Sequence, residues 1–210
     1  MKFINLIAAI LFLGTFSLLA DEKKPLTILC VGDSLTAGYG LKEHMAYPKL
    51  IEKQLNEQGK NVKVLNAGVS GNTSAGGVRR INWYFNRKID VMVLALGAND
   101  GLRGLPVKST EENLQKIIDL AKKKNPKIKI ILAGMKVPPN MGEEYAVAFE
   151  KLFPDLAKKN SIPLIPFLLT DVAGLKEMNL PDGIHPNEAG QKVVAQNVMK
   201  VLSKVLPSAQ

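Results

Sequence analysis

The sequence is poor in the residues that form disulfides and metal sites. It has one cysteine, Cys30, and two histidines among its 210 residues. A single cysteine cannot close an internal disulfide, so the fold must depend on its hydrophobic core. Cys30 lies inside an apolar run, which is typical of a small buried side chain. No H-E-x-x-H motif and no cluster of Cys and His occurs, so the sequence predicts no metal site.

Signatures of nucleotide and nucleic-acid binding are also missing. Neither G-x-G-x-x-G nor G-x-x-x-x-G-K-[ST] occurs, so the sequence predicts no cofactor. The net charge of +9 comes mostly from scattered lysines, and no basic stripe interleaved with aromatic residues indicates nucleic-acid binding. Scattered lysines are typical of a solvated surface. A weak, peripheral attraction to anionic membranes fits the charge equally well.

The first 20 residues have the pattern of a secretory signal peptide. Lys2 precedes the uncharged, mostly apolar stretch from Phe3 to Leu19, and Ala20 is followed at once by charged residues. An uncleaved membrane anchor is the alternative, but 17 residues barely span a bilayer. We therefore expect residues 1–20 to be a signal peptide, residues 21–210 to be the mature domain, and the protein to be exported to the periplasm or secreted.

After residue 25, strand-like and helix-like segments alternate. Short aliphatic runs predict five strands: Leu26–Val31, Val62–Leu65, Val91–Leu96, Ile128–Ala133 and Ile162–Phe167. Helical periodicity predicts three helices, around residues 47–55, 114–121 and 194–205. Alternation of this kind implies one α/β domain with a five-stranded, mostly parallel sheet that is covered on both faces.

Three boundary signals refine the helices. Ser109 and Glu112 form a candidate capping box at the start of the second helix, and Pro126 ends that helix. Pro186 is expected to be the first residue of the last helix.

Candidate site residues follow three of the predicted strands. Ser34 comes after the first strand, Gly71 after the second and Asn99 after the third. Ligands of an open parallel sheet bind outside the carboxyl ends of its strands, so these three loops are expected to meet at one rim.

Ser34 is the candidate nucleophile. It stands in Gly32-Asp33-Ser34-Leu35, where glycine next to a strand end allows a tight turn that exposes the hydroxyl. The Ser34 backbone N–H, ahead of a helix, can also donate to an oxyanion. Taken alone, a turn or N-cap serine explains the same residues. Asp33 is expected to hold the turn through backbone N–H groups.

His185 is the candidate base and Asp182 the candidate orienting carboxylate. A serine hydroxyl needs a base to take its proton, and a three-residue spacing lets one loop carry both groups. A capping Asp and a surface His before Pro186 are the structural alternative. The other histidine, His44, has no carboxylate at a useful spacing and is expected to lie on the surface.

Two further residues are candidate oxyanion donors. Asn99 offers a side-chain amide and Gly71 an unobstructed backbone N–H, although both residue types are also ordinary at strand ends. Ser70 is a rival nucleophile. Its surroundings, Gly68-Val69-Ser70-Gly71-Asn72, do not match the G-x-S-x-G elbow of α/β-hydrolases.

Four short blocks of the sequence together resemble those of the SGNH, or GDSL, hydrolase family over nearly the whole mature chain. They are Gly32-Asp33-Ser34-Leu35, Ser70-Gly71-Asn72, Gly97-Ala98-Asn99-Asp100 and Asp182-Gly183-Ile184-His185. In that family the block of Ser34 holds the nucleophile, Gly71 and Asn99 match the oxyanion residues, and Asp182 and His185 match the acid–base block. The resemblance implies a flavodoxin-like three-layer α/β/α sandwich and cofactor-free hydrolysis of esters or thioesters.

The runs Asn99–Pro106 and Asp182–Asn187 are also similar in sequence to one branch of the family, the periplasmic enzymes with thioesterase I, lysophospholipase and arylesterase activities. That similarity implies that the Gly101–Pro106 loop flanks an acyl groove and that Met135–Tyr145 forms another wall.

The resemblance implies a small acyl ester or thioester, including lipid esters, as the partner. We expect a monomer that binds no nucleic acid. Two alternatives stay open: a carbohydrate O-acetyl esterase that uses the same site, and a non-catalytic periplasmic protein that binds lipid or sugar.

Overall fold

The computed structural model describes residues 24–207 and contains one five-stranded sheet. Its strands are β1 (Leu26–Gly32), β2 (Val62–Gly68), β3 (Val91–Ala95), β4 (Lys129–Ala133) and β5 (Leu164–Ile165). They run in the order β2-β1-β3-β4-β5, and every neighbouring pair is parallel. This is the strand order of flavodoxin-like folds. The predicted sheet is confirmed, and it is entirely rather than mostly parallel.

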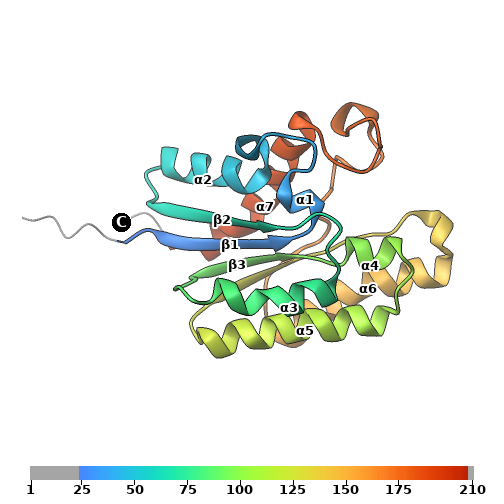
Figure 1. The fold of residues 1–210 in the computed structure, drawn as a ribbon, viewed down its shortest axis with the longest axis horizontal. Coiled ribbons are helices and arrows are strands. Elements are labelled where there is room, and N and C mark those ends of the chain that lie inside the picture. Colours follow the sequence, from blue (N-terminus) through green and yellow to red (C-terminus); the bar gives the residue numbers. More distant parts are fainter. Residues whose placement is uncertain (1–23, 208–210) are drawn as a thin grey trace, which may run out of the picture.

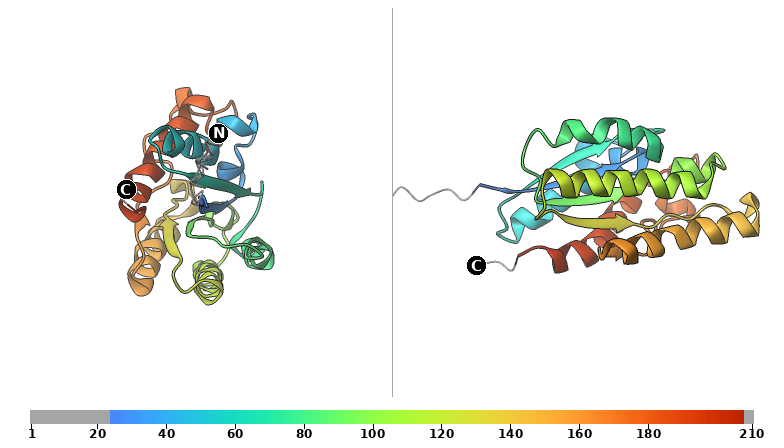
Figure 2. Two further views of the ribbon diagram at one scale, coloured as in Figure 1. Left: turned by 90° about the vertical axis from the view of Figure 1, so that its left-hand side faces the viewer. Right: turned by 90° about the horizontal axis from the view of Figure 1, so that it is seen from below.

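Helices cover both faces of the sheet, which makes three layers (Figures 1 and 2). One face carries α2 (Tyr47–Glu57) and α7 (Glu188–Val205), and the other carries α3 (Ser74–Tyr84), α5 (Val107–Lys124) and α6 (Glu143–Asn160). Short helical turns lie in the connections: α1 (Ser34–Ala37), α4 (Ala98–Leu102), η1 (Glu43–Met45), η2 (Pro139–Met141) and η3 (Lys176–Met178). No helix within residues 24–207 is both long and apolar enough to cross a bilayer.

The central strands are buried because helices cover them from both sides. All five residues of β3 are buried, and so are residues 28–32 of β1. Continuous aliphatic runs of this kind are expected in parallel sheets, where neither face meets water. Cys30 is fully buried among them, and burial raises the pKa of its thiol to about 12. The prediction that Cys30 is a core side chain is confirmed.

Two of the predicted boundaries are wrong. The helix α5 begins at Val107 with Pro106 as its N-cap, so Ser109 lies inside the first turn and forms no capping box. The helix α7 begins at Glu188, because the side chain of Asn187 caps it by accepting a hydrogen bond from the Gly190 N–H (3.0 Å). Pro186 lies ahead of that helix.

The predicted fifth strand is too long, and two helices escaped prediction. Only Leu164 and Ile165 pair with β4, because the flanking Pro163 and Pro166 have no N–H to donate to a ladder. The helix α3 contains paired glycines and α6 contains Pro154, residues that usually interrupt helices. The predicted signal peptide lies outside the described residues.

Candidate active site

Ser34 lies where β1 passes into α1. Asp33 is the N-cap of α1, and its Oδ1 accepts a hydrogen bond from the Leu35 N–H (3.0 Å). This contact confirms the expected turn-holding role of Asp33. Gly32 is required here, because a Cβ at that position would overlap the side chain of Thr36. The tight turn leaves Ser34, a residue that is 9% exposed, just past the carboxyl end of β1.

His185 contacts both Ser34 and Asp182, although 151 residues separate it from the serine. Its Nε2 lies 3.0 Å from Ser34 Oγ, and its Nδ1 lies 2.7 Å from Asp182 Oδ2. The ring of Tyr39 lies against the imidazole, with the ring centroids 4.4 Å apart. The three predicted residues therefore form one hydrogen-bonded chain.

The loop that carries Asp182 and His185 holds its own geometry. Asp182 Oδ1 accepts hydrogen bonds from the backbone N–H groups of Ile184 (2.9 Å) and His185 (3.0 Å). Gly183, which lies between Asp182 and Ile184, has a φ of +70°, a conformation that glycine adopts without strain. Hydrogen bonds from the His185 backbone and ring and from the Ile184 N–H lower the pKa of Asp182 to about 2. Asp182 is therefore a carboxylate at any physiological pH.

Asn99 approaches Ser34 from the end of β3 through a contact that sequence reasoning did not find. Its Nδ2 donates to Oδ2 of Asp33 (3.2 Å), so Asp33 holds both the serine turn and the asparagine amide. Asp33 is completely buried, and that burial raises the pKa of its carboxyl to about 6, against the opposing hydrogen bonds from Leu35 and Asn99. One hydrogen of the Asn99 amide is thereby fixed, and the other remains for a ligand.

A second buried carboxylate fixes α4. Asp100 is 2% exposed, and its Oδ2 accepts the backbone N–H of Ser74 at 2.8 Å. The hydroxyl groups of Ser74 and Thr110 donate to Oδ1 of the same carboxylate. These bonds connect the starts of α3 and α5 to the segment that carries Asn99, so they restrict where Asn99 can lie.

Gly71 lies in the turn that follows β2. Its φ is +74°, and its carbonyl accepts a hydrogen bond from Nη2 of Arg103 at the end of α4 (3.0 Å). Gly71 does not line the groove described below, whereas Asn99 does.

Ser70, the rival nucleophile, is exposed beside Gly71. Within residues 24–207, His185 forms its hydrogen bond to a serine with Ser34. His44 is exposed on η1, as predicted.

Arg80, which sequence reasoning also missed, connects the Ser34 and Gly71 loops. Its Nη2 donates to the Gly32 carbonyl and its Nη1 to the Ala67 carbonyl, both at 2.7 Å. Its Nε donates to Oδ1 of Asn72 (3.2 Å), the residue after Gly71. A planar guanidinium can hold three acceptors in one fixed arrangement, which a lysine ammonium cannot reproduce. Arg80 therefore sets the distance between the two loops.

Replacing Arg80 with lysine is expected to lower kcat by about 10- to 10²-fold, because small displacements of reacting groups are costly. KM should change less than about twofold, since Arg80 does not line the groove described next. The control is Arg79→Lys on the same helix, where the side chain is exposed. Steady-state kinetics and a urea unfolding curve together distinguish a positioning role from a purely structural one. A loss of stability with unchanged kcat would mean that Arg80 only supports the fold.

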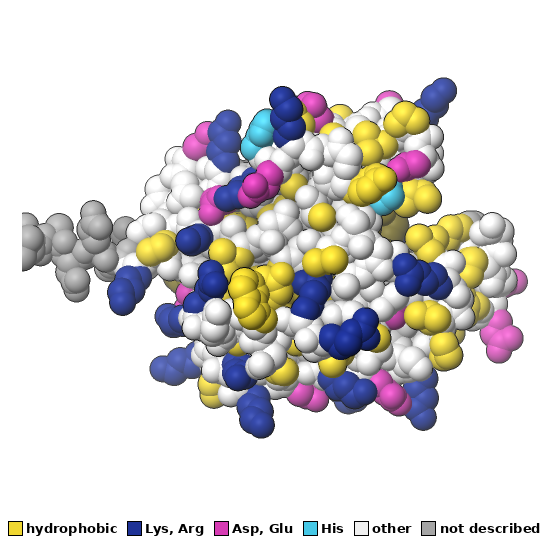
Figure 3. All heavy atoms as spheres, viewed as in Figure 1, with side chains coloured by type: hydrophobic (Ala, Val, Ile, Leu, Met, Phe, Trp, Pro, Cys, Tyr) yellow, Lys and Arg dark blue, Asp and Glu magenta, His cyan; other side chains and the backbone are white. Residues whose placement is uncertain are grey.

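A groove of about 620 Å³ opens beside Ser34, Asn99 and His185. Its walls are mostly apolar and include Leu102, Val137 and Ile184. Figure 3 shows the molecule hollowed beside a histidine at this end. Leu102 belongs to the expected Gly101–Pro106 flank and Val137 to the expected Met135–Tyr145 wall. The size lies within the range of small-molecule sites.

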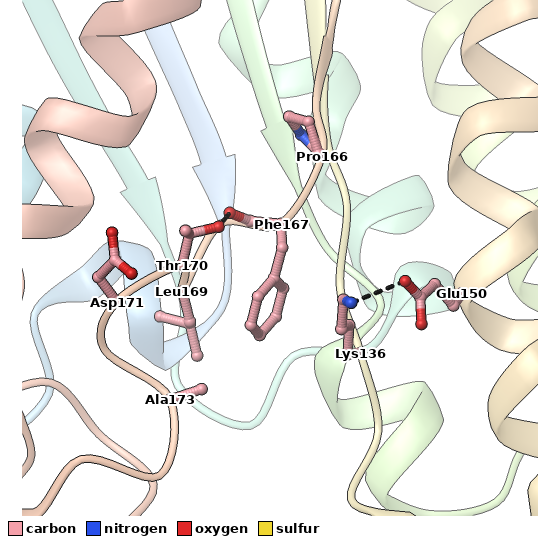
Figure 4. Close-up of a pocket in the computed structure, with 8 residues that line it drawn as sticks. All are labelled: Lys136, Glu150, Pro166, Phe167, Leu169, Thr170, Asp171 and Ala173. Carbon is pink, nitrogen blue, oxygen red and sulfur yellow. Dashed lines mark hydrogen bonds and ion pairs between the residues drawn. The ribbon is translucent and has the colours of Figure 1, made fainter.

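A third wall, residues 167–174, was not predicted. It separates the groove from a side pocket of about 390 Å³, and Phe167 and Lys136 line both. Figure 4 shows the Phe167 ring between Leu169 and Lys136, whose Nζ forms an ion pair with Glu150 (2.7 Å). The segment lies outside regular helix and strand, so no periodicity marks it. Residues 24–207 contain no group of three His, Cys, Asp or Glu side chains that could hold a metal ion.

Comparisons with known proteins find relatives over most of the chain. The model of the GDSL-like Lipase/Acylhydrolase family matches residues 30–193. The chain is 35% identical to an arylesterase of Vibrio mimicus, over 97% of this chain and 100% of that protein. It is also 35% identical to the thioesterase 1/protease 1/lysophospholipase L1 of Escherichia coli (strain K12), over 86% and 85%. A crystal structure of TesA superposes with a TM-score of 0.82 at 36% identity, covering 86% of this chain and 99% of that one.

Proposed function

The chain belongs to the GDSL-like Lipase/Acylhydrolase family and is a carboxylic ester hydrolase, and from this premise we propose that it forms an acyl-enzyme on Ser34. In this proposal His185 is the general base and Asp182 orients it. The backbone N–H groups of Ser34 and Gly71 and the side-chain amide of Asn99 stabilise the oxyanion.

The observation that carries the proposal is the hydrogen-bonded chain from Ser34 through His185 to Asp182. Its distances of 3.0 and 2.7 Å lie within the reach needed for proton transfer. The low pKa of Asp182, which hydrogen bonds from His185 and Ile184 cause, keeps a negative charge beside the imidazole. That charge stabilises the imidazolium that forms when His185 accepts the serine proton.

The reaction then proceeds in two steps. His185 takes the proton of Ser34 as the hydroxyl oxygen attacks the acyl carbonyl, and it returns that proton to the leaving alcohol or thiol. A water molecule, deprotonated by His185, attacks the acyl-enzyme. As the acid leaves, His185 returns the proton to the Ser34 oxygen. In both tetrahedral intermediates the oxyanion donors carry the developing negative charge.

The apolar groove supports acyl esters and thioesters, including aryl esters and lysophospholipids, as the substrates. Leu102, Val137 and Ile184 offer an acyl chain apolar contacts. A panel of p-nitrophenyl acyl esters, an acyl thioester, a lysophospholipid and an acetylated sugar tests this. We expect turnover on the acyl substrates. Turnover confined to the acetylated sugar would favour the O-acetyl esterase instead, and the absence of hydrolysis on every substrate would favour a non-catalytic binding protein.

We also propose export of a cofactor-free, monomeric hydrolase domain that spans residues 21–210. The signal-like pattern of residues 1–20 supports this proposal, as does a described fold whose first strand begins at Leu26. Mass spectrometry of the protein recovered outside the cytoplasm tests the division: a retained residue 1–20 segment would contradict it.

Asn99→Ala is expected to lower kcat by about 10²- to 10³-fold, the usual cost of losing one oxyanion donor. KM should change little, because the charge that the amide meets develops only in the transition state. Asp33→Asn would place an amide against the Asn99 amide and should turn that donor away, with a similar loss. The double variant should then be little worse than either single one. Fully additive losses would contradict a shared role.

A further inference from the structure

A second groove, of about 520 Å³, lies at the opposite end of the sheet from Ser34. It is formed by the first residues of β1, by β2 and by the connection from α3 to β3. Leu26 and Leu65 provide apolar contacts in it, and four cations line it: Lys24, Lys63, Arg87 and Lys88. The single acid in the lining, Asp90, forms an ion pair with Lys88 (2.7 Å) and accepts the Thr27 N–H (2.9 Å). We call these nine lining residues, 24–27, 63, 65, 87, 88 and 90, the basic groove.

Trp83 stands beside the basic groove and is 64% exposed, the highest value among the exposed large hydrophobic side chains of residues 24–207. The guanidinium of Arg87 lies 5.8 Å from the centroid of its ring, which joins the tryptophan to the groove. Figure 3 shows hydrophobic side chains on this face with Lys and Arg side chains around them. The stretch from Arg79 to Lys88 thus places three consecutive aromatic residues between two pairs of cations.

We propose that the basic groove and Trp83 form a docking surface for an anionic phospholipid membrane. Three cations remain after Asp90 has paired with Lys88, and they face outward around apolar side chains. That combination fits a membrane surface, where lipid phosphates lie directly above hydrocarbon. Tryptophan favours the same interfacial level, because its ring is apolar and its N–H is polar.

Docking at this surface leaves the Ser34 site accessible. Leu26 in the groove and Gly32 next to the nucleophile are the two ends of the seven-residue strand β1, which spans about 20 Å. The surface and the hydrolytic site can thus be occupied together, and neither proposal requires the other.

The experiment uses Trp83, which is the only tryptophan of the chain. The exported protein, with its N-terminus defined by mass spectrometry, is titrated with phosphatidylcholine vesicles that contain or lack phosphatidylglycerol. We expect the Trp83 emission to shift to shorter wavelength, together with co-sedimentation, only with the anionic vesicles. Raising the salt from 0.05 to 0.5 M should weaken both effects, because screening shortens the reach of exposed charges.

Charge variants localise the effect. Lys63→Glu with Arg87→Glu should weaken vesicle binding at least tenfold while hydrolysis of a soluble ester stays unchanged. The matched control, Lys53→Glu with Lys192→Glu, alters the net charge equally on α2 and α7 and should bind within about twofold of wild type.

Four results would overturn the proposal. One is co-sedimentation without a Trp83 shift, and another is equal binding by the groove variant. A third is an equal Trp83 response to heparin or to monomeric fatty acid. The last is a shift that depends only on protein concentration, which would indicate self-association.

Discussion

Replacing Ser34 with alanine is expected to lower turnover of acyl esters on the order of 10⁶-fold, because the acyl-enzyme can no longer form. The oxyanion donors and the groove would remain, so substrate binding should persist. The hydroxyl lies 3.0 Å from His185 Nε2, and its removal leaves the base without a nucleophile to activate. Stopped-flow and steady-state assays on p-nitrophenyl esters measure the loss of turnover.

The matched control is Ser70→Ala. Ser70 also follows a strand end, but it is exposed and stands in the turn beside Gly71. It should keep activity within about threefold of wild type. Loss of activity in Ser70→Ala but not in Ser34→Ala would mean that Ser70 is the nucleophile.

His185→Ala is the second variant with a very large expected effect, also on the order of 10⁶-fold in kcat, because nucleophile and base act as one unit. Combining it with Ser34→Ala should cost little more than either change alone. The control is His44→Ala, which removes the only other histidine, exposed on η1, and should be nearly silent. Equal losses for the two histidine variants would instead indicate a general effect on folding.

The main contacts of the site were predictable from the sequence, because they depend on residues that follow strand ends. A parallel sheet brings the carboxyl ends of its strands to one rim, so Ser34 and Asn99 had to be near each other. The spacing of Asp182 and His185 allowed one loop to hold both. The resemblance to a family then indicated that this loop returns to Ser34, which alternation of strands and helices alone does not determine.

The supporting contacts were not predictable in the same way. Arg80 and Asp100 act through the direction in which their side chains point, and only the packing of α3 and α4 determines that direction. Asp33 was already explained by the serine turn and Asn99 by its role as an oxyanion donor, so nothing in the sequence indicated the contact between them. The wall at residues 167–174 has no periodicity, so neither a helical nor a strand pattern could place it.

The central claim, that Ser34 carries the acyl group, is tested most directly by mapping a covalent adduct. The protein is treated with a fluorophosphonate, digested with trypsin and analysed by mass spectrometry. Cleavage at Lys42 and Lys63 separates the peptide of Ser34 from that of Ser70. We expect a single stoichiometric adduct on Ser34, absent after Ser34→Ala and strongly slowed after His185→Ala. An adduct on another serine, or labelling that persists in Ser34→Ala, would contradict the account.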